Sequence, residues 1–235
     1  MSRGERVLRL LRGSRTIPRT RWTARSPWKP TAGSLTSLVV GLWLFGTGDA
    51  FLLTADLGAT PWTVLSQGVS VRTGYPIGAT TFIVSIAVLL LWIPLKQKPG
   101  LGTVLNIVVI SIAIQVMYDV VPAPTGLPAR LVLVLLGIAT IGLGSGIYLT
   151  AGHGPGPRDG WMTGLHHRTG QPVGRIRLAI EITVLVAGWL LGGTVGIGTA
   201  LFALLIGQFV AVGLSLVTHL APPEPHETTQ HDVEH

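Results

Sequence analysis

The heptapeptide RTGYPIG at residues 72–78 recurs as RTGQPVG at residues 168–174, which lie 96 positions further along the chain. At the same offset, residues 41–108 align with residues 137–204 without a gap, and 22 of the 68 pairs are identical. Many of the matching residues are Gly, Pro, Arg or Thr, so a shared hydrophobic composition does not produce the alignment. A repeat of this length is too long for a solenoid unit and indicates a duplicated half-protein.

The composition is that of a membrane protein. Of the 235 residues, 48% are hydrophobic and 11% are charged, whereas a soluble domain carries about 25% charged residues. Between the charged ends lie apolar stretches of about 20 residues, the length that crosses a bilayer core. We therefore expect an all-α polytopic membrane protein. The chain has no cysteine, which excludes disulfides and thiolate metal sites.

Six apolar segments are long enough to be transmembrane helices. Their predicted ranges are 35–56, 76–95, 101–121, 130–151, 174–193 and 197–219. The predicted organisation is a basic cytoplasmic tail, two membrane repeats and a polar, disordered cytoplasmic tail, at 1–33, 34–121, 122–220 and 221–235. This assignment puts fifteen Lys and Arg residues on the side of the N-terminus and two, Arg72 and Arg130, on the other side. The positive-inside rule then predicts that both termini are cytoplasmic.

The first 29 residues hold nine Lys and Arg residues and one acid, Glu5. An organellar transit peptide has a similar composition, but we interpret the segment as a tail that fixes the orientation and contacts anionic lipid headgroups. The bilayer is thus the expected partner, and the charge is no indication of nucleic-acid binding. The sequence leaves the oligomeric state open, a homo-oligomer included.

Each copy of the repeat contains three predicted spans. Three is odd, so the second copy enters the membrane from the opposite side, and the two halves are predicted to be inverted repeats. This design is typical of secondary transporters. The alternative is that the duplication built a stable helix bundle with no role in transport.

A short segment follows the first span of each half. Thr60 before Pro61 reads as an N-cap followed by proline at the first helical position, so we expect short helices over 61–71 and 157–167. Short Gly- and Pro-interrupted segments at matching places indicate a transporter site, and their free N–H groups suit an anionic or carbonyl-bearing solute. The candidate residues are Thr60, Pro61, Trp62 and Gly156. The helices either re-enter the membrane or lie flat at its two surfaces.

The charged pair Arg158-Asp159 replaces Trp62-Thr63 of the first copy. Beside a glycine-rich helix start, it could bind solute or form a cytoplasmic gate. The alternative is ordinary loop charge, with Arg158 serving the positive-inside rule. We interpret the pair as functional because it departs from the repeat at the start of the short predicted helix.

Two acids lie within predicted spans, Asp49 and Glu181, and their repeat partners are Ser145 and Ser85. Inversion puts Asp49 with Ser85 in an outer layer and Glu181 with Ser145 in an inner layer. An ionisable residue inside a membrane is a functional hypothesis by default, and we assign Asp49 a coupling role. For Glu181 a structural pair with Arg177, one helical turn earlier, is sufficient.

No Ser/His/Asp arrangement, phosphate loop or zinc pattern occurs, so we expect neither an enzyme nor a bound cofactor or metal. His153, His166 and His167 lack the spacing of metal ligands.

The second half resembles the YczE branch of the YitT/YczE-like bacterial integral membrane proteins. The resemblance rests on 156–160 (GPRDG), 168–170 (RTG), Glu181 and 188–199, and in the first half on 57–62 and 72–74. It implies a bacterial inner-membrane location and brings no established substrate.

These observations favour a secondary transporter or permease of a small polar or anionic solute. The alternative is a non-transporting membrane module that binds a partner protein or a substrate for a separate engine.

Overall fold

The computed structural model describes residues 17–222, and this part of the chain is helical. The helices are α2 (Ala32–Ala55), α3 (Pro61–Thr73), α4 (Ile77–Leu90), α5 (Trp92–Leu95), α6 (Leu101–Val120), α7 (Leu127–Leu149), α8 (Pro157–Thr169), α9 (Val173–Leu190) and α10 (Ile197–Leu220). Five segments of this part, α2, α4 with α5, α6, α7 and α10, are long and apolar enough to cross a membrane. The chain is therefore a polytopic helical membrane protein, as expected.

The two short helices begin where the sequence predicts. Thr60 caps α3, its side chain accepting from the Thr63 N–H, and Pro61 is the first helical residue. Both helices end at a glycine in the left-handed conformation, Gly74 with φ 75° and Gly170 with φ 68°. Glycine adopts this conformation without the steric cost of a Cβ atom. The heptapeptide that recurs in the sequence is thus a helix C-cap followed by the start of the next helix.

In three pairs of matched helices, the two helices begin 96 residues apart: α3 and α8, α4 and α9, and α6 and α10. Their connections are also matched. The Gly198 N–H donates to the Leu57 carbonyl at 2.7 Å, and the Gly102 N–H donates to that of His153 at 2.8 Å. The hydroxyl of Thr199 donates to the Ala59 carbonyl at 2.9 Å. Its counterpart is the Thr103 hydroxyl, which donates to Pro155 at 2.8 Å.

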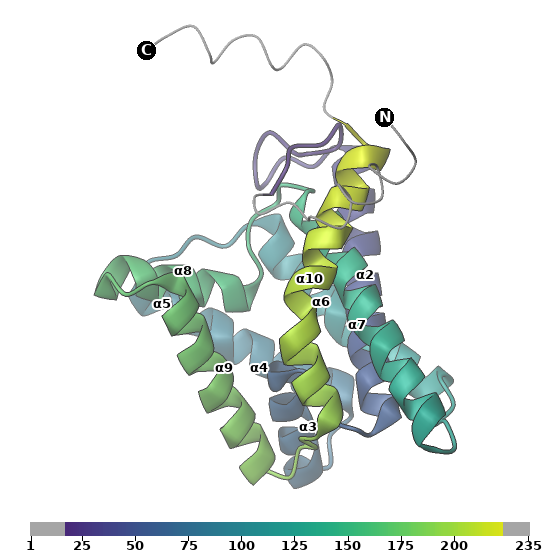
Figure 1. Cartoon of the computed structure of the whole chain (residues 1–235). Coiled ribbons are helices and arrows are strands. Elements are labelled where there is room, and N and C mark those ends of the chain that lie inside the picture. The colour runs from purple at the N-terminus through teal and green to yellow at the C-terminus, as the bar shows by residue number, and fades with distance from the viewer. Residues whose placement is uncertain (1–16, 223–235) are drawn as a thin grey trace, which may run out of the picture.

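One group of helices, α2, α6, α7 and α10, packs side by side (Figure 1). Glycines let α2 and α7 approach closely: a Cβ on Gly41 would lie 2.8 Å from the Gly144 carbonyl oxygen, and one on Gly48 would lie 2.6 Å from that of Gly137. Gly144 is the repeat partner of Gly48, and Gly137 is the partner of Gly41. Small residues at such crossings are the usual means of tight packing between membrane helices.

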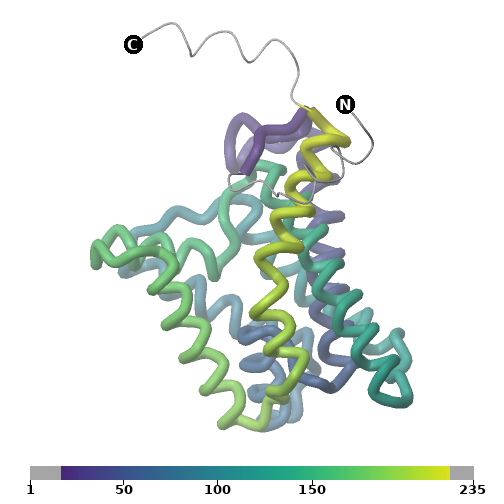
Figure 2. The backbone as a smooth tube through the Cα atoms, viewed as in Figure 1, coloured from purple at the N-terminus to yellow at the C-terminus, as the bar shows by residue number. Residues whose placement is uncertain are grey.

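The remaining helices form a second group in which each half contributes to the packing of the other. Helix α3 packs against α9, and α8 packs against α4 and α5 (Figure 2). At the first contact Gly188 admits the backbone at Val64. At the contact of α8 with α5 the large and the small residue change places: the Trp92 ring on α5 covers Gly160 on α8. The Trp92 Nε1–H also donates to the Pro157 carbonyl at 2.8 Å.

The halves differ where the two groups meet. Helix α4 packs against α6, whereas α9 and α10 make no comparable contact within residues 17–222. Gly78 on α4 lies against α6, and its N–H donates to the Gln115 Oε1 at 2.9 Å. On the repeat partner of Gly78, Gly174, a Cβ would meet nothing within 4 Å, and the same holds for Gly207, the partner of Ser111.

Residues 17–31 belong to the predicted cytoplasmic tail, and they pack on the protein. The Ala24 N–H donates to the Ala151 carbonyl at 2.9 Å, and the Trp22 Nε1–H donates to the Thr150 hydroxyl at 3.2 Å. Figure 1 places this segment and the C-terminal end of α10 at the same end of the molecule. The rest of the tails, residues 1–16 and 223–235, lies outside the described residues.

Candidate functional site

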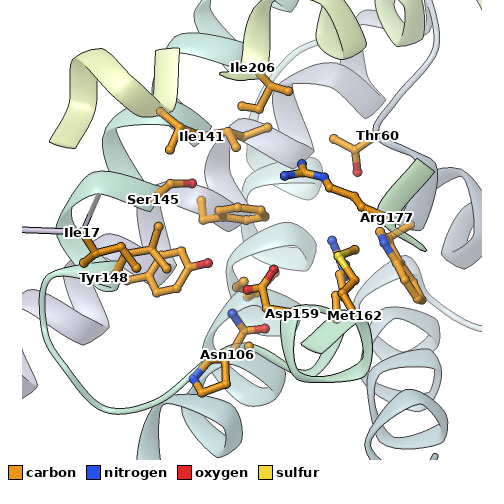
Figure 3. Close-up of a pocket in the computed structure, with 18 of the residues that line it drawn as sticks. Ile17, Thr60, Asn106, Ile141, Ser145, Tyr148, Asp159, Met162, Arg177 and Ile206 are labelled. Carbon is orange, nitrogen blue, oxygen red and sulfur yellow. The ribbon is translucent and has the colours of Figure 1, made fainter. Parts of the chain in front are cut away.

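A cavity of about 660 Å³ lies where α9 and α10 stand apart. This volume falls in the range of small-molecule sites, about 300–1,000 Å³. The polar residues that line it are Thr60, Asn106, Ser145, Tyr148, Arg158, Asp159, Arg177 and Glu181. Figure 3 shows polar groups of Asn106, Tyr148 and Asp159 directed into a common space.

The six residues predicted to bind or gate solute all line this cavity. They are Thr60, Pro61, Trp62, Gly156, Arg158 and Asp159. The structure brings them together because the N-terminal ends of α3 and α8 converge: the Trp62 and Trp161 rings are 6.2 Å apart, and the Arg158 guanidinium lies 5.2 Å above the Trp62 ring. Trp62 and Arg158 are repeat partners, so a residue of one half contacts its own counterpart in the other.

Asp49 lies behind the cavity wall and is fully buried. Neither of its carboxylate oxygens has a hydrogen-bond partner among the described residues. The Thr60 and Thr63 hydroxyls are near enough to interact with it, but they bond to each other at 2.7 Å. Arg158 is the charge that acts on it. Because an unpartnered buried carboxylate is costly, this residue stands out from the rest of the site.

Arg177 and Glu181 form the predicted pair. The Arg177 Nε–H donates to the Glu181 Oε1 at 2.9 Å, and both side chains line the cavity. Ser145 lines the same cavity, so the structure brings it together with Glu181. Ser85 is buried on α4 and is not part of the cavity wall.

Asp159 is open to the cavity, while Arg158 is half-buried in its wall. Desolvation by the surrounding protein raises the pKa of Asp159, and the positive charges of Arg177 and Arg158 oppose that shift. Arg158 makes no hydrogen bond and no ion pair within 4.0 Å with another residue of the described range, so its N–H groups are available to a ligand.

The opposite wall is apolar. Phe202, Ile206 and Val210 line it from α10 at a spacing of four residues, which puts them on one face of the helix. The cavity therefore has a charged side from α8 and α9 and an apolar side from α10. Ile17 and Pro27, from the segment before α2, also line it.

Two lining residues, Asn106 and Tyr148, were not among the sequence predictions. Asn106 was detectable, because it is one of two amide side chains, with Gln115, inside the apolar segment 101–120. Tyr148 lies near the end of α7, where aromatic residues are common in membrane helices, so the sequence gives no reason to single it out.

Comparison with known proteins identifies relatives but no activity. A model described as "Family of unknown function (DUF6198)" matches residues 33–214. An uncharacterized protein of Haemophilus influenzae is 43% identical over 213 residues, covering 91% of this chain and 97% of that protein. The uncharacterized membrane protein YczE of Bacillus subtilis is 31% identical over 159 residues, covering 67% of this chain and 74% of YczE. No solved structure matches.

Proposed function

The chain belongs to the DUF6198 family and is a relative of YczE, which confirms the resemblance stated from the sequence, and we propose that it is a secondary transporter of a small polar solute. The cavity between α9 and α10 is the solute site. The two halves are inverted repeats that exchange conformations, so that the cavity opens to one side of the inner membrane and then to the other.

The observation that carries this proposal is the unequal packing of matched glycines. Gly78 is packed against α6, whereas Gly174 and Gly207 face open space. If the halves exchange conformations, α9 docks on α10 through these two glycines, and α4 leaves α6. The packed contact in the first half is thus the template for the contact that closes the cavity in the second.

Reciprocal contacts support the inversion. Gly41 meets Gly144 and Gly48 meets Gly137, a pattern in which each residue contacts the partner of the other, as it does across a two-fold axis. Both ends of the described chain lie on one side (Figure 1), an arrangement that fits an even number of crossings. We take α9 as the sixth span; it carries Arg175, Arg177 and Glu181, more charge than any of the five apolar segments. The charge distribution of the sequence puts both ends in the cytoplasm.

Asp49 is the coupling residue of the proposed transporter. It is buried without a hydrogen-bond partner within residues 17–222, beside the α3 cap and within the field of Arg158. A proton or a monovalent cation taken up here would change the charge next to the solute site.

Cysteine cross-linking tests the exchange directly, because the chain has no native cysteine. The pair Gly174→Cys with Ala211→Cys matches Gly78 and Gln115, whose Cβ positions adjoin in the first half. A disulfide needs Cβ atoms about 4 Å apart, so it forms only when α9 docks on α10. We expect partial cross-linking in membranes, and more of it when Gly78→Leu wedges α4 away from α6. The single-cysteine variants are the controls.

Flux is measured with proteoliposomes loaded with an isotopically labelled extract of bacterial metabolites. We expect at least one solute to leave the proteoliposomes faster than it leaves equally loaded liposomes without protein. Proteoliposomes with Asp49→Asn should retain that solute. If no solute moves and no cross-link forms, the protein is no transporter. A subunit that copurifies with it would then favour the partner-binding module.

A further inference from the structure

The polar part of the cavity wall offers one unpaired cation beside one unpaired anion. Arg177 and Glu181 are bonded to each other at 2.9 Å, which leaves Arg158 and Asp159 as the charged lining residues free to meet a ligand. No other residue of the described range forms an ion pair within 4.0 Å with either of them. The charges of the lining side chains sum to zero.

The guanidinium of Arg158 is held for recognition of a carboxylate. Its central carbon lies over the Trp62 ring, 5.2 Å from the ring centroid, a cation–π contact that uses none of the N–H donors. A guanidinium binds a carboxylate through two parallel hydrogen bonds, a geometry that lysine cannot reproduce. Asp159, the next residue, is open to the same cavity and can accept from an ammonium group.

The apolar wall accounts for the rest of the ligand. Phe202, Ile206 and Val210 face the cavity from α10, opposite the charged pair, and can cover a hydrocarbon group. A ligand with net charge would bring an uncompensated charge into this low-dielectric site, which is costly. A zwitterion with an apolar side chain matches both walls.

We propose that the cavity binds an α-amino acid with an apolar side chain, its carboxylate on Arg158, its ammonium group on Asp159 and its side chain against α10. This inference rests on the proposed transport function and specifies its substrate class. The anionic solute that the sequence suggested is replaced by a zwitterion, because Asp159 and Glu181 balance the two arginines.

The test is the thermal stability of the purified full-length protein in detergent, with a panel of related ligands. A ligand that binds the native state raises the Tm. We expect L-leucine and L-phenylalanine to raise it. We expect no shift from 4-methylpentanoate, which lacks the ammonium group, or from isoamylamine, which lacks the carboxylate, at the same concentration.

Variants assign the two charges. Arg158→Gln should abolish the shift with L-leucine, and Asp159→Asn should lower the affinity at least tenfold. Arg175→Gln, on α9 but outside the cavity wall, is the matched control and should retain the full shift. The ligand panel on the unmodified protein remains decisive if the Arg158 variant fails to fold.

Failure of this inference is distinguishable from failure of the proposed function. A stronger shift from 4-methylpentanoate, isoamylamine or glycerophosphoethanolamine than from any amino acid would overturn the substrate class, as would no shift from any amino acid. The cross-linking of α9 to α10 would still stand in those cases. Conversely, amino-acid binding without that cross-link would leave a binding protein that does not exchange conformations.

Discussion

The two halves of this protein share their helix boundaries but not their packing. In the first half α4 lies against α6, with Gly78 in contact with Gln115 and the α6 backbone. In the second half α9 stands away from α10, and the matching Gly174 and Gly207 face open space. A cavity of about 660 Å³ occupies this place. The cavity therefore lies between the two helices of the second half that lack the contact made by their counterparts in the first half.

This difference teaches that the repeat is more informative where it fails. Positions that match, such as Thr103 and Thr199, hold the connections in place with equivalent hydrogen bonds. Positions that differ, such as Trp62 and Arg158, meet at the cavity. The matching positions form the scaffold, and the positions that differ where α3 and α8 meet carry the charged residues Arg158 and Asp159.

The largest expected effect concerns the contact of α5 with α8, where a large residue, Trp92, packs over a small one, Gly160. Trp92 is buried over Gly160 and bonded to the Pro157 carbonyl. Truncation of such a side chain leaves a cavity, so Trp92→Ala should lower the free energy of unfolding by about 3–5 kcal/mol. Chemical unfolding in mixed micelles measures it, with the exposed Trp189→Ala as the control.

A double variant sharpens the comparison at this contact. Trp92→Gly with Gly160→Val recreates the Val64–Gly188 pair of the matching contact between α3 and α9. It should be more stable than Trp92→Gly alone. If the two changes simply add, the contacts are not equivalent, and the repeat relation does not extend to this packing.

The second effect compares the matched glycines at the asymmetric contact. A Cβ on Gly78 would lie 2.7 Å from the Ser111 carbonyl oxygen, and such overpacking costs about 1–3 kcal/mol. Gly174→Ala meets nothing within 4 Å and gains helix propensity of up to about 1 kcal/mol. We therefore expect Gly78→Ala to lower the Tm and Gly174→Ala to leave it unchanged or raise it. Equal losses at both positions would mean that α9 spends most of its time docked on α10.

Much of this fold was predictable from the sequence because its determinants are local. Apolar length, the Thr60-Pro61 start and the terminal Gly74 and Gly170 fixed the helix boundaries to within a few residues. Six site residues were predictable because they sit at the two short helices, where the repeat breaks. The asymmetry between α4 and α9 was not, since Gly78 and Gly174 are the same residue in the two copies. Their difference is one of conformation, which no alignment of the halves contains.

The third prediction is that matched substitutions in the two halves destabilise the protein equally. The Thr103 hydroxyl donates to Pro155 at 2.8 Å, and the Thr199 hydroxyl donates to Ala59 at 2.9 Å. Each hydroxyl also accepts a hydrogen bond from the N–H of the glycine before its helix, Gly100 or Gly196. A hydrogen bond of this kind contributes about 1 kcal/mol, so Thr103→Val and Thr199→Val should lower the free energy of unfolding by the same amount. Thr183→Val, at an exposed intrahelical bond on α9, is the control. If the two losses in the free energy of unfolding differ by more than twofold, the two connections do not contribute equally to stability.

The smallest effect on stability concerns the pair that replaces Thr81 and Ser85 in the second half. Arg177 and Glu181 are one turn apart on α9 and partly exposed, so Glu181→Gln should cost only about 0.3–0.5 kcal/mol. Its effect on ligand choice should be larger, because Arg177 then adds an unpaired positive charge to the cavity. The Tm shift from 4-methylpentanoate should rise relative to that from L-leucine, while Arg175→Gln, outside the cavity wall, leaves the ratio unchanged. If the ratio does not move, Arg177 and Glu181 serve α9 alone, and the neutrality of the cavity has a different origin.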